Sequence, residues 1–249
     1  MAHRIGFIGM VGSELKADLW GTLERMADLG YQGIEGGNIL LGATPAETAA
    51  NRRRLEDLGL SVIALGASHY RIDQLDQAID QAVALGAGHL VDYWADPKDQ
   101  DELKVLADQL EGMAVRCREA GLRFCYHNHD HEFREGFGDK GKRTFFDALF
   151  AATEALCFEI DIAWAHFGGV DPVGLLRRCG HRVPVIHVKD LSDDRQRGHF
   201  TAVGTGKVPC FAAMEAAAAK GVTWMVVEQD RPNRLSAFES AVASIYNIR

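Results

Sequence analysis

The sequence has few cysteines and no long apolar run. Its five cysteines are odd in number and include no C-x-x-C pair, so we expect reduced thiols in a cytoplasmic protein and no disulfide framework. No segment approaches the roughly 18 consecutive apolar residues of a membrane helix, and the short apolar stretch at the N-terminus soon meets Glu14, Lys16 and Asp18. We therefore expect neither a membrane span nor a secretory signal.

Basic residues are fewer than acidic ones. The chain has 27 Lys and Arg against 35 Asp and Glu, for a formal charge of −8. Because binding to nucleic acid needs a basic face, this balance argues against a nucleic-acid partner. The composition, 47% hydrophobic and 25% charged, is that of a globular protein, and 249 residues suit either two ordinary domains or one α/β barrel.

Short apolar runs alternate with longer amphipathic segments along the whole chain. Eight runs have the length and composition of buried strands. They are residues 4–9, 33–36, 61–66, 89–94, 122–128, 157–163, 184–190 and 224–230. Five of the intervening helical patterns end in a glycine, the usual stop signal of a helix.

Eight strand–helix units in about 250 residues predict a single (β/α)8 TIM barrel over residues 1–249. No linker or low-complexity tract divides the chain. A doubly wound dinucleotide-binding sheet would have a Gly-rich fingerprint after its first strand, and this sequence has none there. The charged, glycine-containing segment 130–143 is predicted to be a long loop after the fifth strand. Such loops build the active site of this architecture.

Polar side chains lie at or just after the ends of the second, third and fifth to eighth predicted strands. In a closed barrel the carboxyl ends of the strands surround one axis, so these side chains must converge. A single histidine at a strand end would more often be a hydrogen-bonded structural residue, and a single aspartate would more often cap the next helix. The residues are Glu35, His69, Tyr126, His127, Asn128, His129, Asp161, Trp164, His187, Lys189, Asp190, Glu228, Gln229 and Asp230.

Burying several ionisable groups together is costly unless a cation or substrate compensates. His127, Asp161, His187 and Glu228 form a mixed nitrogen and oxygen set that suits one divalent ion, Mn, Co, Zn or Mg. His129 is two residues from His127 on the same strand and faces the same way, so either histidine could be the ligand. Lys189 shares a face with His187 and should point at whatever the ion holds.

Five motifs in this order resemble the sugar phosphate isomerase/epimerase family with the xylose-isomerase-like TIM barrel: YHNHDHEF, EIDIAWAHFGGVDP, VPVIHVKDL, VGTGKV and VVEQD. The resemblance implies one divalent metal, with manganese favoured, held by a Glu, an Asp, a His and a second Glu. The last three fall on Asp161, His187 and Glu228. The first Glu falls on His127, counting from Gly121, so the chain resembles a YHNH-type subgroup that is also similar to inosose dehydratases.

Other residues have a functional and a structural interpretation. Glu35 is a catalytic carboxylate or the partner of a nearby cation, and His69 is a candidate substrate ligand. Trp94 and Trp164 either stack on a sugar or pack at the rim. The loop 203–208 is expected to shape a turn rather than hold a phosphate, residues 51–57 to form a solvated helix face, and Cys125 and Cys157 to be inert.

These observations favour a metal-dependent isomerase or epimerase of a sugar or keto-sugar, acting through an enediolate. Glu228 or a strand-five histidine would remove the α-proton, and Lys189 would stabilise the oxyanion. Loss of a β-hydroxyl would instead make the chain a dehydratase of a keto-sugar or inosose. A nuclease with the same barrel and a non-catalytic sugar-binding protein are weaker alternatives. The expected partner is a small sugar or cyclitol, and a homo-oligomer is left open.

Overall fold

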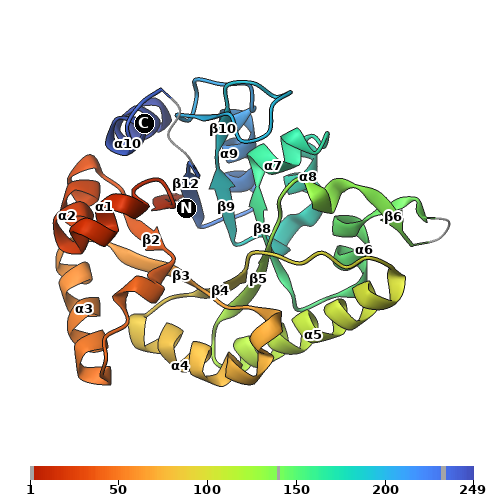
Figure 1. Cartoon of the computed structure of the whole chain (residues 1–249), viewed down its shortest axis with the longest axis horizontal. Coiled ribbons are helices and arrows are strands. Elements are labelled where there is room, and N and C mark those ends of the chain that lie inside the picture. Colours follow the sequence, from red (N-terminus) through yellow and green to blue (C-terminus); the bar gives the residue numbers. More distant parts are fainter. Residues whose placement is uncertain (1–2, 139–140, 231–233) are drawn as a thin grey trace.

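The predicted barrel is confirmed. The computed structural model describes residues 3–138, 141–230 and 234–249 and contains a closed barrel of parallel strands (Figure 1). In barrel order the strands are β1 (Arg4–Ile8), β12 (Trp224–Glu228), β9 (Val185–Val188), β8 (Cys157–Asp161), β5 (Arg123–His127), β4 (His89–Asp92), β3 (Ser61–Gly66) and β2 (Gly33–Glu35). Each lies within one of the eight predicted runs.

Helices surround the barrel and connect its strands (Figure 1). The α-helices are α1 (Gly12–Ala17), α2 (Leu19–Leu29), α3 (Pro45–Asp57), α4 (Leu75–Leu85), α5 (Gln100–Glu119), α6 (Phe145–Ala152), α7 (Ile162–Phe167), α8 (Pro172–Cys179), α9 (Cys210–Ala219) and α10 (Ala237–Ile248). The short 3₁₀ helices are η1 (Gly37–Leu40), η2 (His69–Gln74), η3 (His131–Phe133) and η5 (Gly180–Arg182).

Local signals in the sequence explain where several helices begin and end. Gly30 and Gly86 follow α2 and α4 in the left-handed conformation, with φ of 97° and 70°, which a glycine adopts without steric cost. Thr44 and Glu47 form a reciprocal capping box at the start of α3. These ends are set by nearby residues, and the sequence could therefore predict them.

The segment 130–143 is more ordered than a loop. After η3 it contains the antiparallel pair β6 (Glu135–Phe137) and β7 (Arg143–Thr144), while residues 139 and 140 lie outside the described part. The ring of Phe137 lies 5.8 Å from that of Phe145 in α6. Phe137 has mostly charged and glycine neighbours in the sequence, and its contact with Phe145 packs the hairpin against α6.

Apolar side chains fill the barrel interior toward the amino ends of the strands, and polar side chains occupy the interior at the carboxyl ends. The inner core contains Ile63, Ala64, Val91, Cys125, Val185, Trp224 and Val226, separate from the larger core between strands and helices. Arg4 lies over the Trp224 ring at 4.1 Å, at the amino ends of β1 and β12. The barrel is therefore a packed body whose reactive groups can gather only at the carboxyl ends of the strands.

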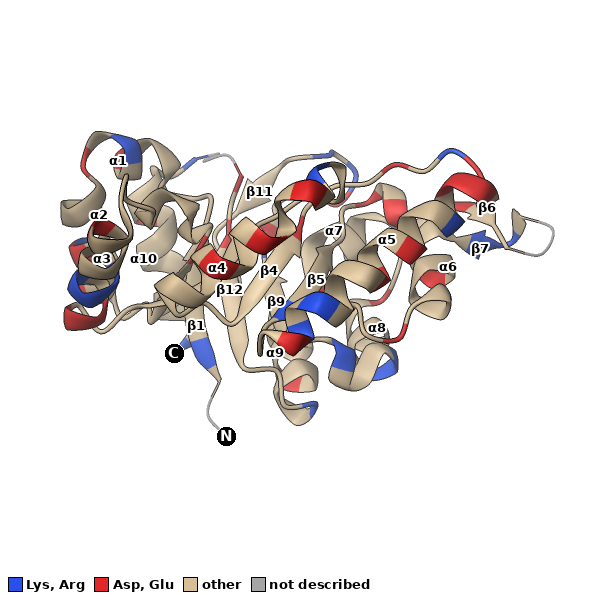
Figure 2. Ribbon diagram, turned by 90° about the horizontal axis from the view of Figure 1, so that it is seen from below, with Lys and Arg blue, Asp and Glu red and all other residues tan. Residues whose placement is uncertain are grey.

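Charge is spread over the outside of the molecule. Figure 2 shows Lys and Arg on several separate elements. By sequence, α3 contains Arg52 to Arg54, α5 contains Arg116 and Arg118, and α8 contains Arg177 and Arg178. Among the described residues, no helix is both long and apolar enough to cross a bilayer.

Candidate active site and metal centre

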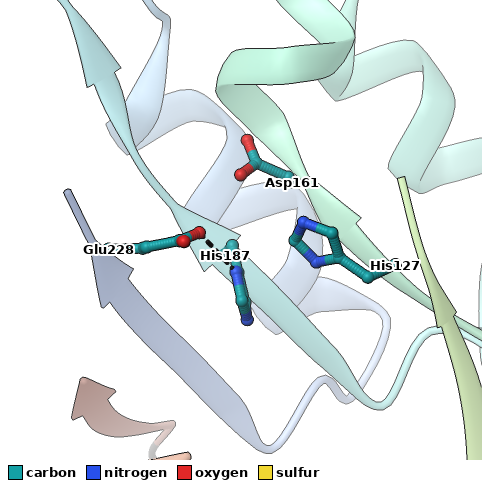
Figure 3. Close-up of side chains that lie close together, drawn as sticks. All are labelled: His127, Asp161, His187 and Glu228. Atoms are coloured by element: carbon teal, nitrogen blue, oxygen red, sulfur yellow. Dashed lines mark hydrogen bonds and ion pairs between the residues drawn. The ribbon is translucent and has the colours of Figure 1, made fainter. Parts of the chain in front are cut away.

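Four predicted ligands converge at the carboxyl end of the barrel. His127, Asp161 and Glu228 are the last residues of β5, β8 and β12, and His187 lies in β9. One potential ligand atom from each lies within 4.8 Å of the others. Figure 3 shows the side chains of the four residues gathered at the ends of neighbouring strands. The strand alternation thus places a nitrogen and oxygen donor set in one buried spot, as predicted.

Asp161 offers one oxygen to a cation. Its Oδ1 accepts the backbone N–H groups of Ala163 and Trp164, both at 2.9 Å, and so caps α7. Its Oδ2 is buried and has no hydrogen-bond partner, although the Lys189 Nζ lies 3.0 Å away. Burial raises the pKa of this carboxyl, while Lys189 opposes the rise. The Lys189 ammonium offsets part of the cost of burying this carboxylate, and a bound ion would give the same oxygen a second positive partner.

His187 lies between carboxylates on both sides of its ring. Its Nδ1 is 2.8 Å from Glu228 Oε2, and its Nε2 is 3.0 Å from both Glu35 Oε2 and Glu159 Oε1. Burial alone would lower the pKa of the imidazole, but the charges of Glu159, Glu35 and Glu228 raise it well above its ordinary value. The site therefore attracts positive charge at this position.

His127 has the opposite tendency. Its Nδ1 is 3.0 Å from Glu159 Oε1, and its side chain is almost completely buried. Burial, together with the neighbouring His187 and His129, lowers the pKa of His127 well below its ordinary value. The neutral imidazole is the form that binds a metal.

Lys189 points into the same cluster, as its spacing from His187 predicted. Its Nζ lies 2.8 Å from Glu228 and 3.0 Å from both Asp161 and Asp230. Burial disfavours the charged amine, yet these three carboxylates raise the pKa of Lys189 above its ordinary value. Burial likewise disfavours a charged Glu228, but Lys189 and His187 hold the pKa of this carboxyl well below its usual range. The pocket thus contains an ammonium group beside an ionised carboxylate.

Glu159 and Tyr93 are site residues that the sequence reasoning missed. Glu159 precedes Asp161 by two residues, so the alternation of β8 turns it inward as well, and this signal could have identified it. It is fully buried, its Oε2 has no hydrogen-bond partner, and burial and Glu35 raise its pKa to about 8. The Tyr93 hydroxyl donates to Glu35 Oε1 at 2.8 Å.

Aromatic rings form the wall around His129. Its ring centroid is 5.2 Å from that of Trp94, 5.7 Å from that of Trp164 and 5.0 Å from that of His127. Trp94 is 46% exposed, whereas Trp164 is buried and packs against Phe200. Burial and the nearby Lys189 lower the pKa of His129 to about 4, so its ring is neutral at pH 7.

The cluster opens into a pocket of about 230 Å³ at the barrel mouth. Its lining consists of Ile8, Tyr93, His127, His129, His187 and Glu228. Glu35 lies deeper, against Tyr93 and His187. A small ligand in this pocket would meet three of the four candidate metal ligands, His127, His187 and Glu228, together with the His129 ring.

His69 lies apart from this cluster. Its Nδ1 is 2.6 Å from Asp92 Oδ2, and its backbone N–H donates to the same oxygen at 2.7 Å. The side chain lines a separate hollow beside Ala95 and Pro97. The structure therefore brings Glu35, His127, His129 and the strand-end acids together but does not bring His69 to them.

The loop 203–208 shapes a turn, as the sequence suggested. The buried carboxylate of Asp190 accepts the backbone N–H groups of Gly204, Gly206 and Val208 at 2.8 to 3.0 Å, as well as that of Leu191. Three amides of the loop are thus already bound by a side chain of the protein. They are not directed at a phosphate.

The sequence model of the xylose isomerase-like TIM barrel matches residues 23–248. The chain belongs to this family. The match covers β2 to β12 and thus all four residues of the candidate metal centre.

Individual relatives are distant in sequence. An inosose dehydratase from Geobacillus kaustophilus is 26% identical over 254 residues, covering 84% of this chain and 79% of the relative. A sugar phosphate isomerase/epimerase structure from Parabacteroides distasonis superposes with a TM-score of 0.82 at 19% identity, covering 98% of this chain and 94% of the other. The IOLI protein, whose structure contains a zinc atom, superposes with a TM-score of 0.72 at 16% identity, covering 97% and 95%. The structural likenesses at these identities establish the fold.

Proposed function

We propose that this protein is a divalent-metal-dependent enzyme that isomerises or epimerises a sugar or keto-sugar through an enediolate. The observation that carries the proposal is the union of three features in one buried site. A four-residue donor set, a protonated Lys189 and an ionised Glu228 lie in contact, and three of the donors, His127, His187 and Glu228, line a pocket of about 230 Å³.

The residues present fit one divalent ion. His127 is neutral, Asp161 has an oxygen without a hydrogen bond, and His187 and Glu228 complete a nitrogen and oxygen set that manganese, cobalt, magnesium or zinc accepts. When bound, such an ion would polarise a carbonyl and make the neighbouring C–H more acidic. His187 would have to lose its proton to become a ligand, so ion binding would release protons.

The side chains around the pocket then divide the proton transfers. Glu228 has an ionised carboxylate whose Oε2 contacts His187 and Lys189, so it can accept an α-proton from a ring in the pocket. Lys189 would stabilise the developing oxyanion with its fixed charge. His129 borders the same space as a neutral ring that can hydrogen-bond to a hydroxyl, and Glu35 holds the imidazole of His187 from below.

A dehydratase of a keto-sugar or inosose is the second candidate. It is favoured by the likeness to an inosose dehydratase over 84% of the chain. It is also favoured by His127, since epimerisation by two symmetric glutamates would need a carboxylate at that position. In a dehydration Glu228 would still remove the α-proton. Lys189, held protonated by three carboxylates, could then deliver a proton to the departing β-hydroxyl.

Solvent exchange tests the step that both candidates share. The manganese-loaded protein is incubated in D₂O with keto-sugars and with inososes, and the α-hydrogen is followed by NMR. We expect deuterium to enter the α-position of at least one compound. Exchange with an isomeric or epimeric product supports the first function, and loss of water supports the second. Absence of exchange across the whole panel would refute enolisation.

A further inference from the structure

A second hollow lies beside the active-site pocket, on the rim formed by the ends of β3 and β4 and by η2 and α4. Its volume is about 500 Å³, more than twice the 230 Å³ of the pocket at the barrel mouth. Tyr93 lines both, so the two spaces adjoin at one side chain. We call the larger space the rim cleft. A ligand that reached past the Tyr93 side chain would contact both spaces.

The rim cleft is rich in amide side chains. Gln74, Gln77 and Gln81 line it on the side of η2 and α4. None of the three forms a side-chain hydrogen bond with any residue that the structure describes, so their donors and acceptors are available to a ligand. A primary amide offers two N–H donors and a carbonyl acceptor, which match hydroxyl groups that both donate and accept.

Two exposed aromatic rings border the same cleft. Tyr70 is 71% exposed and Trp94 is 46% exposed, and both belong to the lining. Trp94 is held in place by His131, whose ring centroid is 4.3 Å away and whose Nε2 lies 2.8 Å from the backbone oxygen of Ala95. Aromatic faces with a polar edge are suited to ligands that have both apolar C–H faces and hydroxyl groups.

The charge of the lining argues against a phosphorylated group. It contains one cation, Arg71, and one acid, Asp92. The Asp92 carboxylate is already bound by His69 and by the backbone N–H of Trp94. Tight phosphate sites combine several charge-assisted donors, whereas a neutral polyhydroxy ligand needs amides and aromatic faces.

We propose that the rim cleft is a second sugar subsite and that the substrate is a disaccharide or related glycoside. One ring would occupy the pocket at the metal centre, and the second would lie among Tyr70, Trp94 and the three glutamines. This inference rests on the proposed function for the chemistry of the first ring. The volumes agree with it, because the 230 Å³ pocket is smaller than typical ligand sites of about 300 to 1,000 Å³ and the adjoining cleft supplies the remaining space.

Calorimetric titration of the magnesium-loaded protein tests the subsite. The probes are trehalose, sucrose, maltose and cellobiose, with glucose and myo-inositol as single-ring references. We expect at least one disaccharide to bind about tenfold more tightly than either single ring, since stacking and hydrogen bonds in the cleft add to the affinity. Tyr70→Ala and the double variant Gln77→Leu with Gln81→Leu should each reduce this advantage to about threefold or less.

The matched control is Tyr246→Ala, which removes another exposed tyrosine, on α10 and outside the cleft lining. It should leave the preference for a disaccharide unchanged. The subsite is refuted if no disaccharide binds more tightly than the single rings, or if the cleft variants weaken single rings and disaccharides equally. Disaccharide binding without any α-hydrogen exchange would contradict the proposed chemistry alone, and exchange without a disaccharide preference would contradict the subsite alone.

Discussion

His187 is the residue on which the electrostatics of the site depend. One ring nitrogen faces Glu228, and the other faces both Glu35 and Glu159. Three carboxylates around one imidazole favour its protonated form. The protonated ring of His187 therefore supplies positive charge to the same carboxylates that a bound divalent ion would neutralise. Glu159 contributes to this arrangement from below, because its Oε1 contacts His127 and His187 together.

Glu228→Gln should separate metal binding from catalysis. The amide keeps the shape of the side chain and one oxygen, but it cannot accept a proton. We expect metal content to be retained and turnover to fall by roughly two to four orders of magnitude, the usual effect of losing a positioned base. Elemental analysis and the exchange assay measure the two quantities.

Glu215→Gln, on the exposed face of α9, is the matched control and should change neither metal content nor turnover. Wild-type exchange in Glu228→Gln would move the base to His129 or Glu35.

Glu132 should make stability depend on pH. Its carboxyl is buried, accepts the Tyr126 hydroxyl and the His129 backbone N–H at 2.8 Å each, and has a pKa raised by burial to about 7. The folded state therefore binds this proton more tightly than the unfolded state, whose pKa is about 4.3. The stabilisation is complete below the unfolded pKa and is lost as the pH rises through about 7.

Urea unfolding from pH 5 to pH 8 measures this effect. Glu132→Gln removes the titrating group, so we expect the free energy of unfolding of the variant to fall less steeply over this range than that of the wild type. Parallel pH profiles for the two proteins would contradict the assignment. Glu215→Gln again serves as the exposed control.

At the scale of elements, Asp190 anchors the loop 203–208 at the carboxyl end of β9. It starts the short strand β10 (Asp190–Leu191), which pairs with β11 (Phe200–Thr201), and its carboxylate binds three amides of the loop 203–208. Lys189, the neighbouring residue, points into the candidate metal centre, where it contacts Glu228. One strand end thus supplies both a reactive group and the anchor of the loop beside it.

Asp190→Asn should loosen this loop. The amide replaces one acceptor oxygen with an N–H donor that faces backbone N–H groups, and hydrogen bonds to charged groups are worth about 1.5 to 3 kcal/mol each. We expect a loss of about 3 kcal/mol in the free energy of unfolding and faster proteolysis within residues 203–208. Chemical denaturation and mass spectrometry of the fragments test this. The control is Asp194→Asn, which changes an exposed residue between β10 and β11 and should have little effect on stability. Unchanged stability in Asp190→Asn would show that the loop is held by other contacts.

At the scale of the whole molecule, the candidate metal centre joins four neighbouring strands. The donors come from β12, β9, β8 and β5, which are adjacent in the barrel. An ion bound there would link strands that are about a hundred residues apart in the sequence at the extremes, His127 and Glu228. Binding to the folded state alone must raise stability by mass action.

Metal should therefore stabilise the barrel measurably. With free manganese at one hundred times its Kd, the expected gain is about 2.7 kcal/mol, seen as a higher Tm that a chelator reverses. Elemental analysis should find one ion per chain. In the double variant with Asp161→Ala and His187→Ala we expect no bound ion and no effect of manganese on Tm. Full occupancy in that variant would refute the site, and a metal-bound structure with His127 turned away would promote His129 as the ligand.

Much of this architecture was predictable because it rests on local periodicity. The eight strands follow from apolar runs, and the ends of α2 and α4 follow from glycines. The hairpin of β6 and β7 was not predictable, since it depends on the packing of Phe137 against Phe145 rather than on the composition of the segment.

The sequence by itself determined the barrel and the convergence of His127, Asp161, His187 and Glu228. The physical reason is that a closed parallel barrel directs alternate side chains inward and brings all strand ends to one axis, whatever the details of packing. Only the tertiary structure decided which groups touch. Glu159 contacts two imidazoles from the floor of the site, and His69 turns to Asp92 instead of joining the cluster. The rim cleft likewise arises where η2, α4 and two strand ends meet, and no pattern along one segment specifies a space between several.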